Sequence, residues 1–226
     1  MSNLELTRRV ACMAALVGAL ATTAPAHAII IYGDAASSVG QTGSAFEAEL
    51  TYSFVTPIAA TLTIDLQNTT PPAVGGFLTA FVLNNPDNKI SSVSLLLPPT
   101  NWSLLGLDSN NVNGAPFGQF DFGATTGNSF EGGGNPNLGF TPGTGDPFIF
   151  SFVGTDLDTL TAESFLGAFS VPPGAGGGTQ FFAARFRGLA SGGSDKVAAV
   201  PEPSTYAVLL AGVALVTWRL RRRPLG

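Results

Sequence analysis

The stretch AFEAELTYSFVTPIAATLTIDLQ, residues 45–67, indicates the fold class of this chain. From Phe46 to Phe54 every second residue is apolar, and a glutamate, threonine or serine stands between each pair. A similar alternation runs from Ile58 to Gln67, and Pro57 lies between the two runs. A period of two lets a strand bury one face and expose the other. The stretch therefore predicts an antiparallel pair of strands with one apolar and one polar face.

Further short apolar runs, separated by turn residues, follow along the chain. We expect strands at residues 77–83, 93–97, 102–107, 117–122, 148–153 and 180–188. Alternation within them predicts inward-facing side chains at Phe120, Phe122, Phe148, Phe150, Phe152, Phe182, Ala184 and Phe186, and outward-facing ones at Phe181, Arg185 and Arg187.

One segment outside the two chain ends suits a helix, residues 161–169. Thr161 can cap its N-terminus, Glu163 lies in its first turn, and the pair Pro172 and Pro173 would end it. Residues 123–147 are rich in glycine, asparagine and proline and are expected to form a long loop.

The many short strands, with 28 glycines and 17 phenylalanines, favour an all-β fold. We expect an antiparallel β-sandwich, jelly-roll-like, with one short helix, over residues 29–189; a closed barrel is the alternative. Residues 190–200, which contain Ser-Gly-Gly-Ser, are expected to form a flexible stalk.

The N-terminus has the order of an export signal over residues 1–28. Arg8 and Arg9 precede an apolar run, and Ala26 and Ala28 flank His27 as a small-x-small cleavage site. The mature protein is expected to begin near Ile29, and the adjacent arginines leave the twin-arginine export route as an alternative.

The C-terminus, residues 201–226, combines three features in order. Pro201, Glu202 and Pro203 come first, an uncharged run follows, and Arg219, Arg221, Arg222 and Arg223 come last. A helix over residues 205–218 would rise about 21 Å, which is short for a bilayer core of about 30 Å. The trailing arginines predict a single transmembrane helix with its C-terminus in the cytoplasm.

This order resembles the PEP-CTERM sorting signal. The resemblance implies a Gram-negative bacterial source, export, transient anchoring in the inner membrane, and removal of the tail near Pro201 to Pro203 by an exosortase, a membrane enzyme. Partners so implied are the export machinery and exosortase. A plain membrane anchor is the alternative.

Charge and residue types exclude several functions for the mature chain. Residues 29–200 contain thirteen acidic and four basic residues, so the net charge is about −9 and nucleic acid is not an expected partner. The only cysteine, Cys12, and the only histidine, His27, lie in the expected signal peptide. Without them, Ser-His and Cys-His catalysis and His- or Cys-based metal sites are excluded.

Three kinds of candidate site remain: a pair of carboxylates, exposed aromatic residues and oxygen-rich turns. Glu47 and Glu49 lie at a spacing that a glycosidase could use, but on the expected polar face of a strand. Trp102, with Tyr52 or the long loop, could contact a sugar, although a buried Trp102 is the alternative. We expect no cofactor; calcium is the one metal left open, with ordinary turns as the alternative at Asp87, at residues 108–114, and at Asp156 and Asp158.

We therefore expect a non-enzymatic protein of the cell surface or extracellular matrix, linked through the resemblance to exopolysaccharide or biofilm. A carbohydrate-binding module is the first alternative. A carboxylate-based glycan hydrolase is the second.

Overall fold

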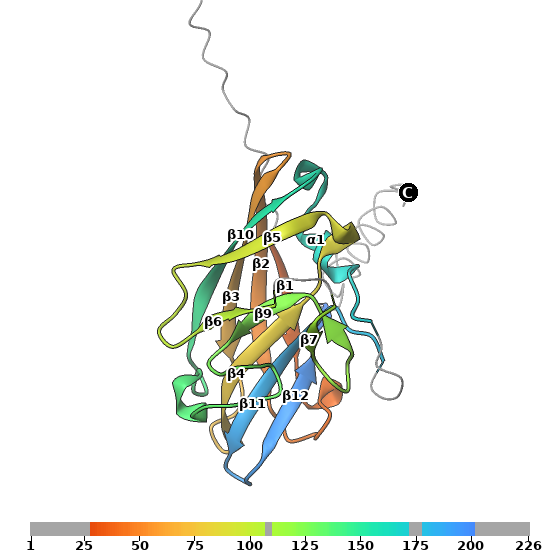
Figure 1. Cartoon of the computed structure of the whole chain (residues 1–226). Coiled ribbons are helices and arrows are strands. Elements are labelled where there is room, and N and C mark those ends of the chain that lie inside the picture. The colour runs from red at the N-terminus through yellow and green to blue at the C-terminus, as the bar shows by residue number, and fades with distance from the viewer. Residues whose placement is uncertain (1–27, 107–109, 172–177, 202–226) are drawn as a thin grey trace, which may run out of the picture.

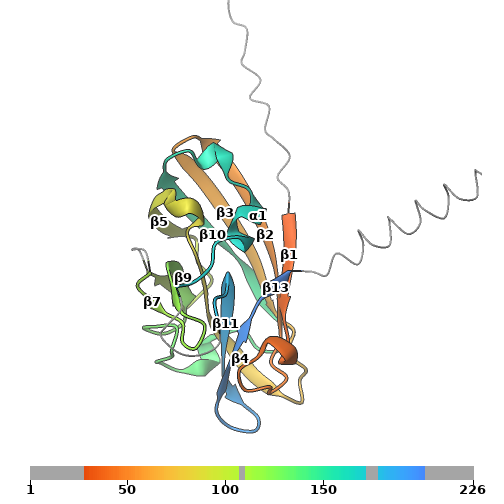
Figure 2. The same cartoon turned by 90° about the vertical axis from the view of Figure 1, so that its right-hand side faces the viewer.

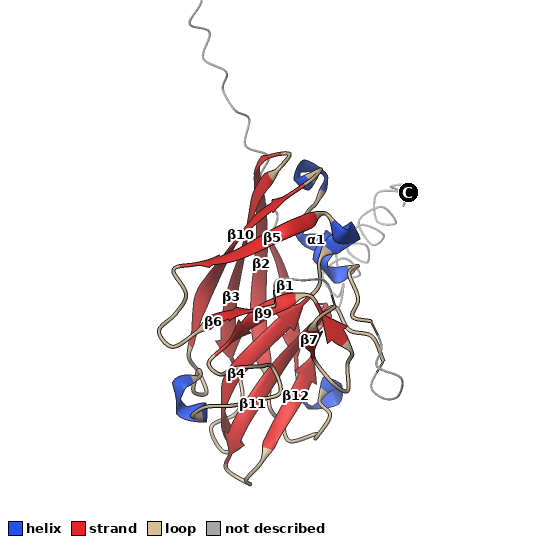
Figure 3. Ribbon diagram, in the orientation of Figure 1, coloured by secondary structure: helices blue, strands red, loops and turns tan. Residues whose placement is uncertain are grey.

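Figures 1 and 3 show a computed structural model of the chain, which describes residues 28–106, 110–171 and 178–201. This part is mostly strand, in antiparallel sheets with one α-helix, so the all-β prediction is confirmed. The first sheet contains, in order, β13 (Val200–Pro201), β1 (Ala28–Gly33), β2 (Phe46–Thr56), β3 (Ala59–Asn68), β10 (Gly145–Gly154) and β5 (Ile90–Leu96). The second contains β12 (Ser194–Ala198), β11 (Phe182–Leu189), β4 (Gly75–Leu83), β9 (Phe122–Thr125) and β6 (Ser103–Leu105).

Smaller elements join these sheets. A two-stranded ribbon is formed by β7 (Val112–Asn113) and β8 (Gln119–Phe120), and the α-helix is α1 (Ala162–Leu166). Four 3-10 turns are η1 (Ala35–Ser37), η2 (Pro86–Asn88), η3 (Pro136–Leu138) and η4 (Leu157–Thr159).

The two sheets face each other and have open edges, at β13 and β5 in the first and at β12 and β6 in the second. The described strands therefore form a sandwich and not the closed barrel considered as the alternative. The chain crosses between the sheets repeatedly, for example from β3 to β4 and from β4 to β5. The jelly-roll form stays a prediction.

The core between the sheets is aromatic. Phe81 on β4 is fully buried, and its ring centroid lies 4.8 Å from that of Phe148, 6.0 Å from Phe150 and 5.6 Å from Phe182. A fully buried phenylalanine contributes roughly 1.5–3 kcal/mol relative to an exposed one. Aromatic burial therefore supplies a large share of the stability of the described domain.

The β2–β3 pair forms as predicted. Glu49 lies opposite Asp65 and Leu50 opposite Ile64, so one face of the pair is polar and the other enters the core. Two apolar residues depart from the pattern: Phe54 is 41% exposed and Ile58 61% exposed. The register shifts between Phe54 and Thr56, at the end of the hairpin that extends past the second sheet in Figure 1.

The expectation that Phe120 and Phe122 share one face was wrong. Phe122 lies in the core between the sheets, whereas Phe120 belongs to a second apolar cluster with Phe117 and Phe130. The reason is a break at Asp121: β8 pairs with β7, and β9 pairs with β4 and β6. A strand period cannot be continued across two separate pairings.

The helix is confirmed in place and in its cap, but it is shorter than predicted. Thr161 and Ser164 form the capping box, and Glu163 lies in the first turn. The helix already ends at Leu166, with Gly167 as its C-cap, before Phe169. The prolines expected to end it at positions 172 and 173 lie outside the described residues.

The glycine-rich stretch 123–147 is not one long loop. β9 continues to Thr125, η3 follows, Phe140 bridges to Leu78, and β10 begins at Gly145. The stretch covers the outer face of the second sheet, because Phe130 is fully buried in the cluster that contains Ala80, Val82 and Ala183.

Strand β11 is consequently buried on both faces over part of its length. Its predicted inward residues are confirmed, since Phe182, Ala184 and Phe186 are fully buried. Phe181, expected to point outward, is only 6% exposed and stacks edge-on against Phe169, so that expectation was wrong. Arg185 and Arg187 are half-buried.

The stalk expected over residues 190–200 is also wrong: this segment is folded. A turn at 190–193 leads into β12, which pairs with β11 from Arg187↔Ser194 to Ala183↔Ala198. Ala199 then donates to the carbonyl of Phe182 at 3.0 Å. The folded domain therefore continues to Pro201 and leaves no spacer before the C-terminal segment.

The expected signal peptide up to residue 27 and the expected transmembrane helix over residues 205–218 lie outside the described residues. In the described ranges, no helix is long and apolar enough to cross a bilayer.

Candidate functional site

The two ends of the described domain lie on neighbouring strands. β13 pairs antiparallel with β1, so that Ile31 is opposite Pro201 and Tyr32 is opposite Val200. β1 begins at Ala28, the expected signal-cleavage residue, and β13 ends at Pro201, the first residue of the expected sorting motif. Figure 2 shows both strands on one edge of the first sheet. The structure thus brings Ala28 and Pro201, 173 positions apart in the sequence, to the same edge.

The other predicted residues of the two signals cannot be placed. Ala26, Glu202, Pro203, and the arginines at 219 and 221–223 lie outside the described residues.

The chain just before β13 is fixed by a buried carboxylate. Asp195 on β12 is 3% exposed and accepts hydrogen bonds from the backbone N–H of Gly40 (3.0 Å) and of Lys196 (2.7 Å) on one oxygen. Its other oxygen accepts from the hydroxyl of Ser38 (2.5 Å) and from both the backbone and the hydroxyl of Thr42. The loop at residues 38–42 is thereby attached to β12.

These contacts also set the charge of the carboxyl. Burial acts to raise the pKa of Asp195, but the hydroxyls of Ser38 and Thr42 and the backbone N–H groups of Gly40 and Lys196 outweigh it and hold the pKa below its usual value. The ionised form is therefore the one that the fold stabilises.

The next residue, Lys196, attaches two further segments. Its ammonium donates to Glu131 at 2.5 Å and to the carbonyl of Ala115, and it lies 5.9 Å from the ring centroid of Phe130. Asp195 and Lys196 thus bind β12 to segments near residues 40, 115 and 131. The strand that precedes the C-terminal segment is therefore held by side-chain contacts as well as by its pairing with β11.

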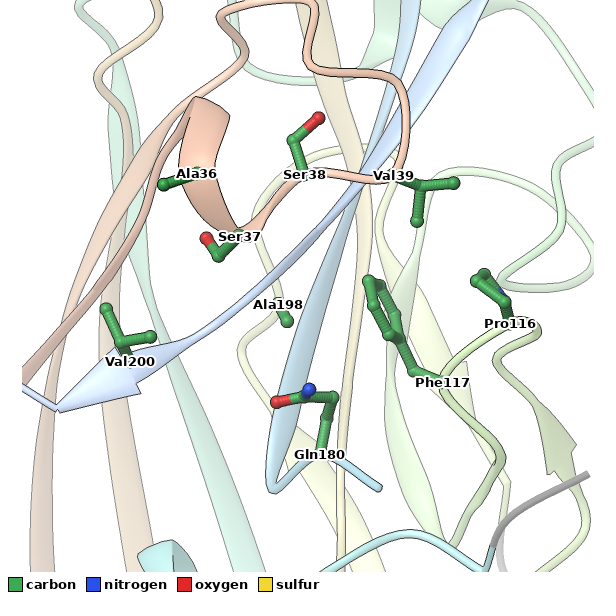
Figure 4. Close-up of a pocket in the computed structure, with 9 residues that line it drawn as sticks. All are labelled: Ala36, Ser37, Ser38, Val39, Pro116, Phe117, Gln180, Ala198 and Val200. Carbon is green, nitrogen blue, oxygen red and sulfur yellow. The ribbon is translucent and has the colours of Figure 1, made fainter. Parts of the chain in front are cut away.

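A neutral pocket adjoins this region (Figure 4). It measures about 460 Å³ and lies between the loop at residues 36–39 and the segment of Pro116 and Phe117. Ala198 and Val200, on either side of the step from β12 to β13, and Gln180 complete its lining. None of the lining residues is charged, so the pocket holds no general acid or base.

The carboxylates Glu47 and Glu49 lie where the sequence placed them, on the exposed face of the first sheet. They surround a hollow of about 240 Å³ together with Asp65, Gln67 and Gly145. Glu49 is directly opposite Asp65, and Glu47 is directly opposite Gln67. Both glutamates are solvent-exposed, as the interpretation as a solvated face requires.

Trp102 is not a surface platform for a sugar. It is 5% exposed and packs between the sheets, with ring centroids 5.0 Å from Phe140 and 4.9 Å from Phe148. The alternative, a buried tryptophan, is what the structure contains.

Tyr52 is likewise buried. Its hydroxyl donates to the carbonyl of Leu157 at 2.7 Å, and burial, with the nearby charge of Asp158, raises its pKa to about 12. Neither aromatic residue is available to stack on a ligand at the surface.

The calcium candidates remain isolated. The Asp87 carboxylate is 3.9 Å from the Lys89 ammonium, and Asp156 is the N-cap of η4, which has Asp158 in its first turn. Residues 107–109 lie outside the described residues. Among the residues that the structure describes, no three His, Cys, Asp or Glu side chains are grouped so that they could hold a metal.

Asp195 and Lys196 are the residues that sequence reasoning missed. They stand in a glycine- and serine-rich stretch whose composition is that of a linker. β12 is buried over Asp195–Ala198, so its side chains show no apolar-polar alternation. The one available signal was a pair of opposite charges in a segment otherwise free of charge.

Comparison with known proteins gives one match. Residues 199–223 match the family model of the PEP-CTERM protein-sorting motif. No curated protein and no solved structure matches the chain. The chain therefore carries a PEP-CTERM sorting motif, the signal of an exported protein processed by an exosortase, and the motif begins at Ala199, within the last folded residues.

Proposed function

We propose that this protein is a non-enzymatic component of the cell surface or extracellular matrix, whose folded domain is exported, held briefly at the inner membrane and released by an exosortase. The observation that carries the proposal is the position of the sorting motif, which starts at Ala199, directly where the folded domain ends. This arrangement fits a folded domain that is itself the exported and released product.

The absence of a spacer supports close contact with the membrane before processing. Four residue steps separate Pro201 from Thr205, where the uncharged run predicted as a transmembrane helix begins. A fully extended chain covers at most about 3.6 Å per residue, so these steps can span no more than about 14 Å. While the tail is anchored, the edge formed by β13 and β1 would lie next to the bilayer.

A non-enzymatic role is supported by the chemistry of the described domain. It contains neither histidine nor cysteine, its pocket has no charged lining, and its grouped carboxylates are exposed. We propose further that neither a cofactor nor a structural calcium ion is required.

We propose a link to polysaccharide as part of this function. With Trp102 and Tyr52 buried, the neutral pocket, the polar face of the first sheet and the segment at residues 126–144 remain as surfaces for a glycan. A glycan array probed with the released domain tests this: binding to no glycan would restrict the proposal to a protein of the surface or matrix that does not itself bind polysaccharide.

The test of the main proposal is the intact mass of the protein from the membrane and extracellular fractions of its native host. We expect a species that begins near Ile29 and ends between Pro201 and Pro203 in the extracellular fraction or at the surface. A membrane-bound species that keeps Arg219 to Arg223 as the only product would contradict it and indicate a permanent anchor.

A second assay addresses the enzymatic alternative. The released domain is expected to release no reducing sugar from the host polysaccharide. Turnover that disappears in Glu47→Gln or Glu49→Gln would overturn the non-enzymatic role.

A further inference from the structure

Two patches of opposite charge lie on opposite outer faces of the sandwich. On the first sheet, Glu47, Glu49 and Asp65 surround the hollow of about 240 Å³ and face the solvent; we call them the acidic face. On the second sheet, Arg185 and Arg187 alternate along β11 with residues of the core and therefore lie on its outer side. We call these two arginines and the turn that joins β11 to β12 the basic hairpin.

The acidic face is not neutralised by its own domain. Glu49 is directly opposite Asp65 in the β2–β3 pairing, and like charges so placed are destabilising. Within the part of the chain that the structure describes, none of the three carboxylates forms an ion pair. Cations supplied by another molecule would therefore stabilise this face.

The guanidinium groups of the basic hairpin are held in place by neutral acceptors. Arg187 donates to the carbonyls of Gly133 at 2.6 Å and Gly134 at 3.3 Å, and Arg185 donates to the hydroxyl of Ser194 at 3.1 Å. A guanidinium has more N–H donors than these contacts use. The contacts thus position both groups and leave their positive charge uncancelled.

The other basic residues of the folded domain already have carboxylate partners. Lys89 and Lys196 each form an ion pair, whereas Arg185 and Arg187 form none with any described residue. Burial lowers the pKa of Arg185; the charge of Glu131 opposes this effect, and that of Arg187 adds to it. Two cations therefore lie close together on a domain whose net charge is about −9 over residues 29–200.

The shape of the hairpin suits a contact with another molecule. Residues 190–193, which join β11 to β12, are exposed and form the lower end of the molecule in Figure 1. Arg187 is opposite Ser194 in the pairing next to this turn. Guanidinium groups bind carboxylates through paired, charge-assisted hydrogen bonds, so a hollow lined by carboxylates is a complementary surface.

We propose that the acidic face of one copy binds the basic hairpin of a second copy, so that the protein assembles head to tail. Charge complementarity identifies the occupant, because every copy carries both patches and leaves both without an internal partner. A single neighbour cannot contact both patches at once, since they lie on opposite outer faces. Such a contact does not close into a twofold dimer and continues to larger assemblies.

The net negative charge of the domain opposes this assembly only in part. Charges on different copies are largely screened beyond about 8 Å at physiological ionic strength, and the paired groups of the contact lie closer than that. The inference rests on the proposed function, since it supplies the contact through which a matrix component would build a matrix. It involves surfaces of the described domain and no part of the sorting motif.

Four variants of the full chain test the contact. Glu49→Lys places a cation on the acidic face, and Asp158→Lys is its matched control, because it makes the same charge change at an exposed carboxylate in η4, outside both patches. Two double variants reverse a whole patch: Glu47→Lys with Glu49→Lys, and Arg185→Glu with Arg187→Glu. Each protein is purified in detergent with EDTA, and its size is measured by sedimentation velocity over a range of concentrations.

We expect the wild type to form species larger than a dimer and Glu49→Lys to associate at least about tenfold more weakly, because like charges then meet across the contact. Asp158→Lys should associate at least as strongly as the wild type, since it lowers the net charge and with it the general repulsion between copies. A loss in Glu49→Lys therefore runs against the effect of net charge alone.

Mixing the two double variants gives a second measurement. Each of them alone carries two patches of one sign and is expected to stay monomeric. In an equal mixture every contact again joins opposite charges, so association should return, which also demonstrates that both variants are folded. If a double variant does not fold, the comparison of Glu49→Lys with Asp158→Lys decides.

Several results would overturn the inference. They are a wild type that stays monomeric up to about 1 mM, assembly that stops at a dimer, and a Glu49→Lys variant that associates like the wild type or is weakened no more than Asp158→Lys. A mixture of folded double variants that stays monomeric would do the same. Association that needs added calcium would assign the acidic face to a bridging cation instead. Each of these results leaves the proposed processing standing, because intact mass from the native host tests that separately.

Discussion

Replacement of Asp195 by alanine is expected to destabilise the domain by about 3 kcal/mol. The carboxylate is buried and accepts five hydrogen bonds, and a bond to a charged group contributes about 1.5–3 kcal/mol. The five contributions do not add, because Ser38 and Thr42 are half-buried and Gly40 is exposed, so that water can replace part of what is lost. For a domain of this size each kcal/mol shifts the melting temperature by about 2–4 °C, which gives about 6–12 °C.

The pH dependence follows from the lowered pKa of Asp195. A carboxyl whose pKa is lower in the folded than in the unfolded state stabilises the fold above the unfolded value, about 3.9 for aspartate. That contribution disappears as the pH falls through the folded-state pKa. The difference in stability between the wild type and Asp195→Asn should therefore be constant from pH 7 to pH 5 and shrink below about pH 4.

The assay is urea unfolding followed by circular dichroism, at a series of pH values, on the purified protein. Asp65→Asn is the matched control, because Asp65 is exposed on the polar face of β3. It is expected to change the free energy of unfolding by less than about 0.5 kcal/mol. A loss below about 1 kcal/mol in Asp195→Ala, or a difference for Asp195→Asn that persists unchanged to the lowest pH, would refute the reasoning.

Five further substitutions, two of which serve as comparison variants, test the packing and the charges. Phe81→Ala is expected to lower the free energy of unfolding by about 3–5 kcal/mol, because it leaves a cavity at the centre of the core. Phe169→Ala should lower it by less than about 1 kcal/mol in the same urea titration, because the ring of Phe169 is 55% exposed. Lys196→Ala should lower the free energy of unfolding by about 1–3 kcal/mol and speed amide exchange around its glutamate partner. Lys89→Ala should lower it by at most about 1 kcal/mol, because the ion pair of Lys89 is 3.9 Å long and its carboxylate partner is exposed. Equal losses in the two variants would contradict the difference in burial. Glu49→Lys replaces the repulsion between two carboxylates on β2 and β3 by an attraction. It should raise the free energy of unfolding by about 0.2–1 kcal/mol at low salt and by less at high salt. No gain at low salt would mean that the two carboxylates do not repel each other.

Local patterns in the sequence were sufficient for much of the fold. The alternation in residues 46–52 and 60–66 predicted β2 and β3, because the period of a strand is a property of neighbouring residues and the polar face of the first sheet stays open to water. The cap at Thr161 was also readable, since its hydrogen bonds join residues three positions apart. The sorting motif at the C-terminus is linear and needs no fold to be recognised.

Where two layers cover one strand, only the tertiary structure determined which side chains are buried. Residues 126–144 and the β7–β8 ribbon lie over the second sheet, so that Ala183 and Ala198 are buried on the face that would otherwise meet solvent. A strand covered on both faces loses its alternation, and β12 follows a turn of serine and glycine, so the segment as a whole had the composition of a stalk. Its stabilising contacts reach from Asp195 and Lys196 to residues 65 to 157 positions away, a separation at which no local pattern carries information. The sequence alone thus identified the signal that directs the protein, and the long-range contacts determined that the folded domain extends directly to it.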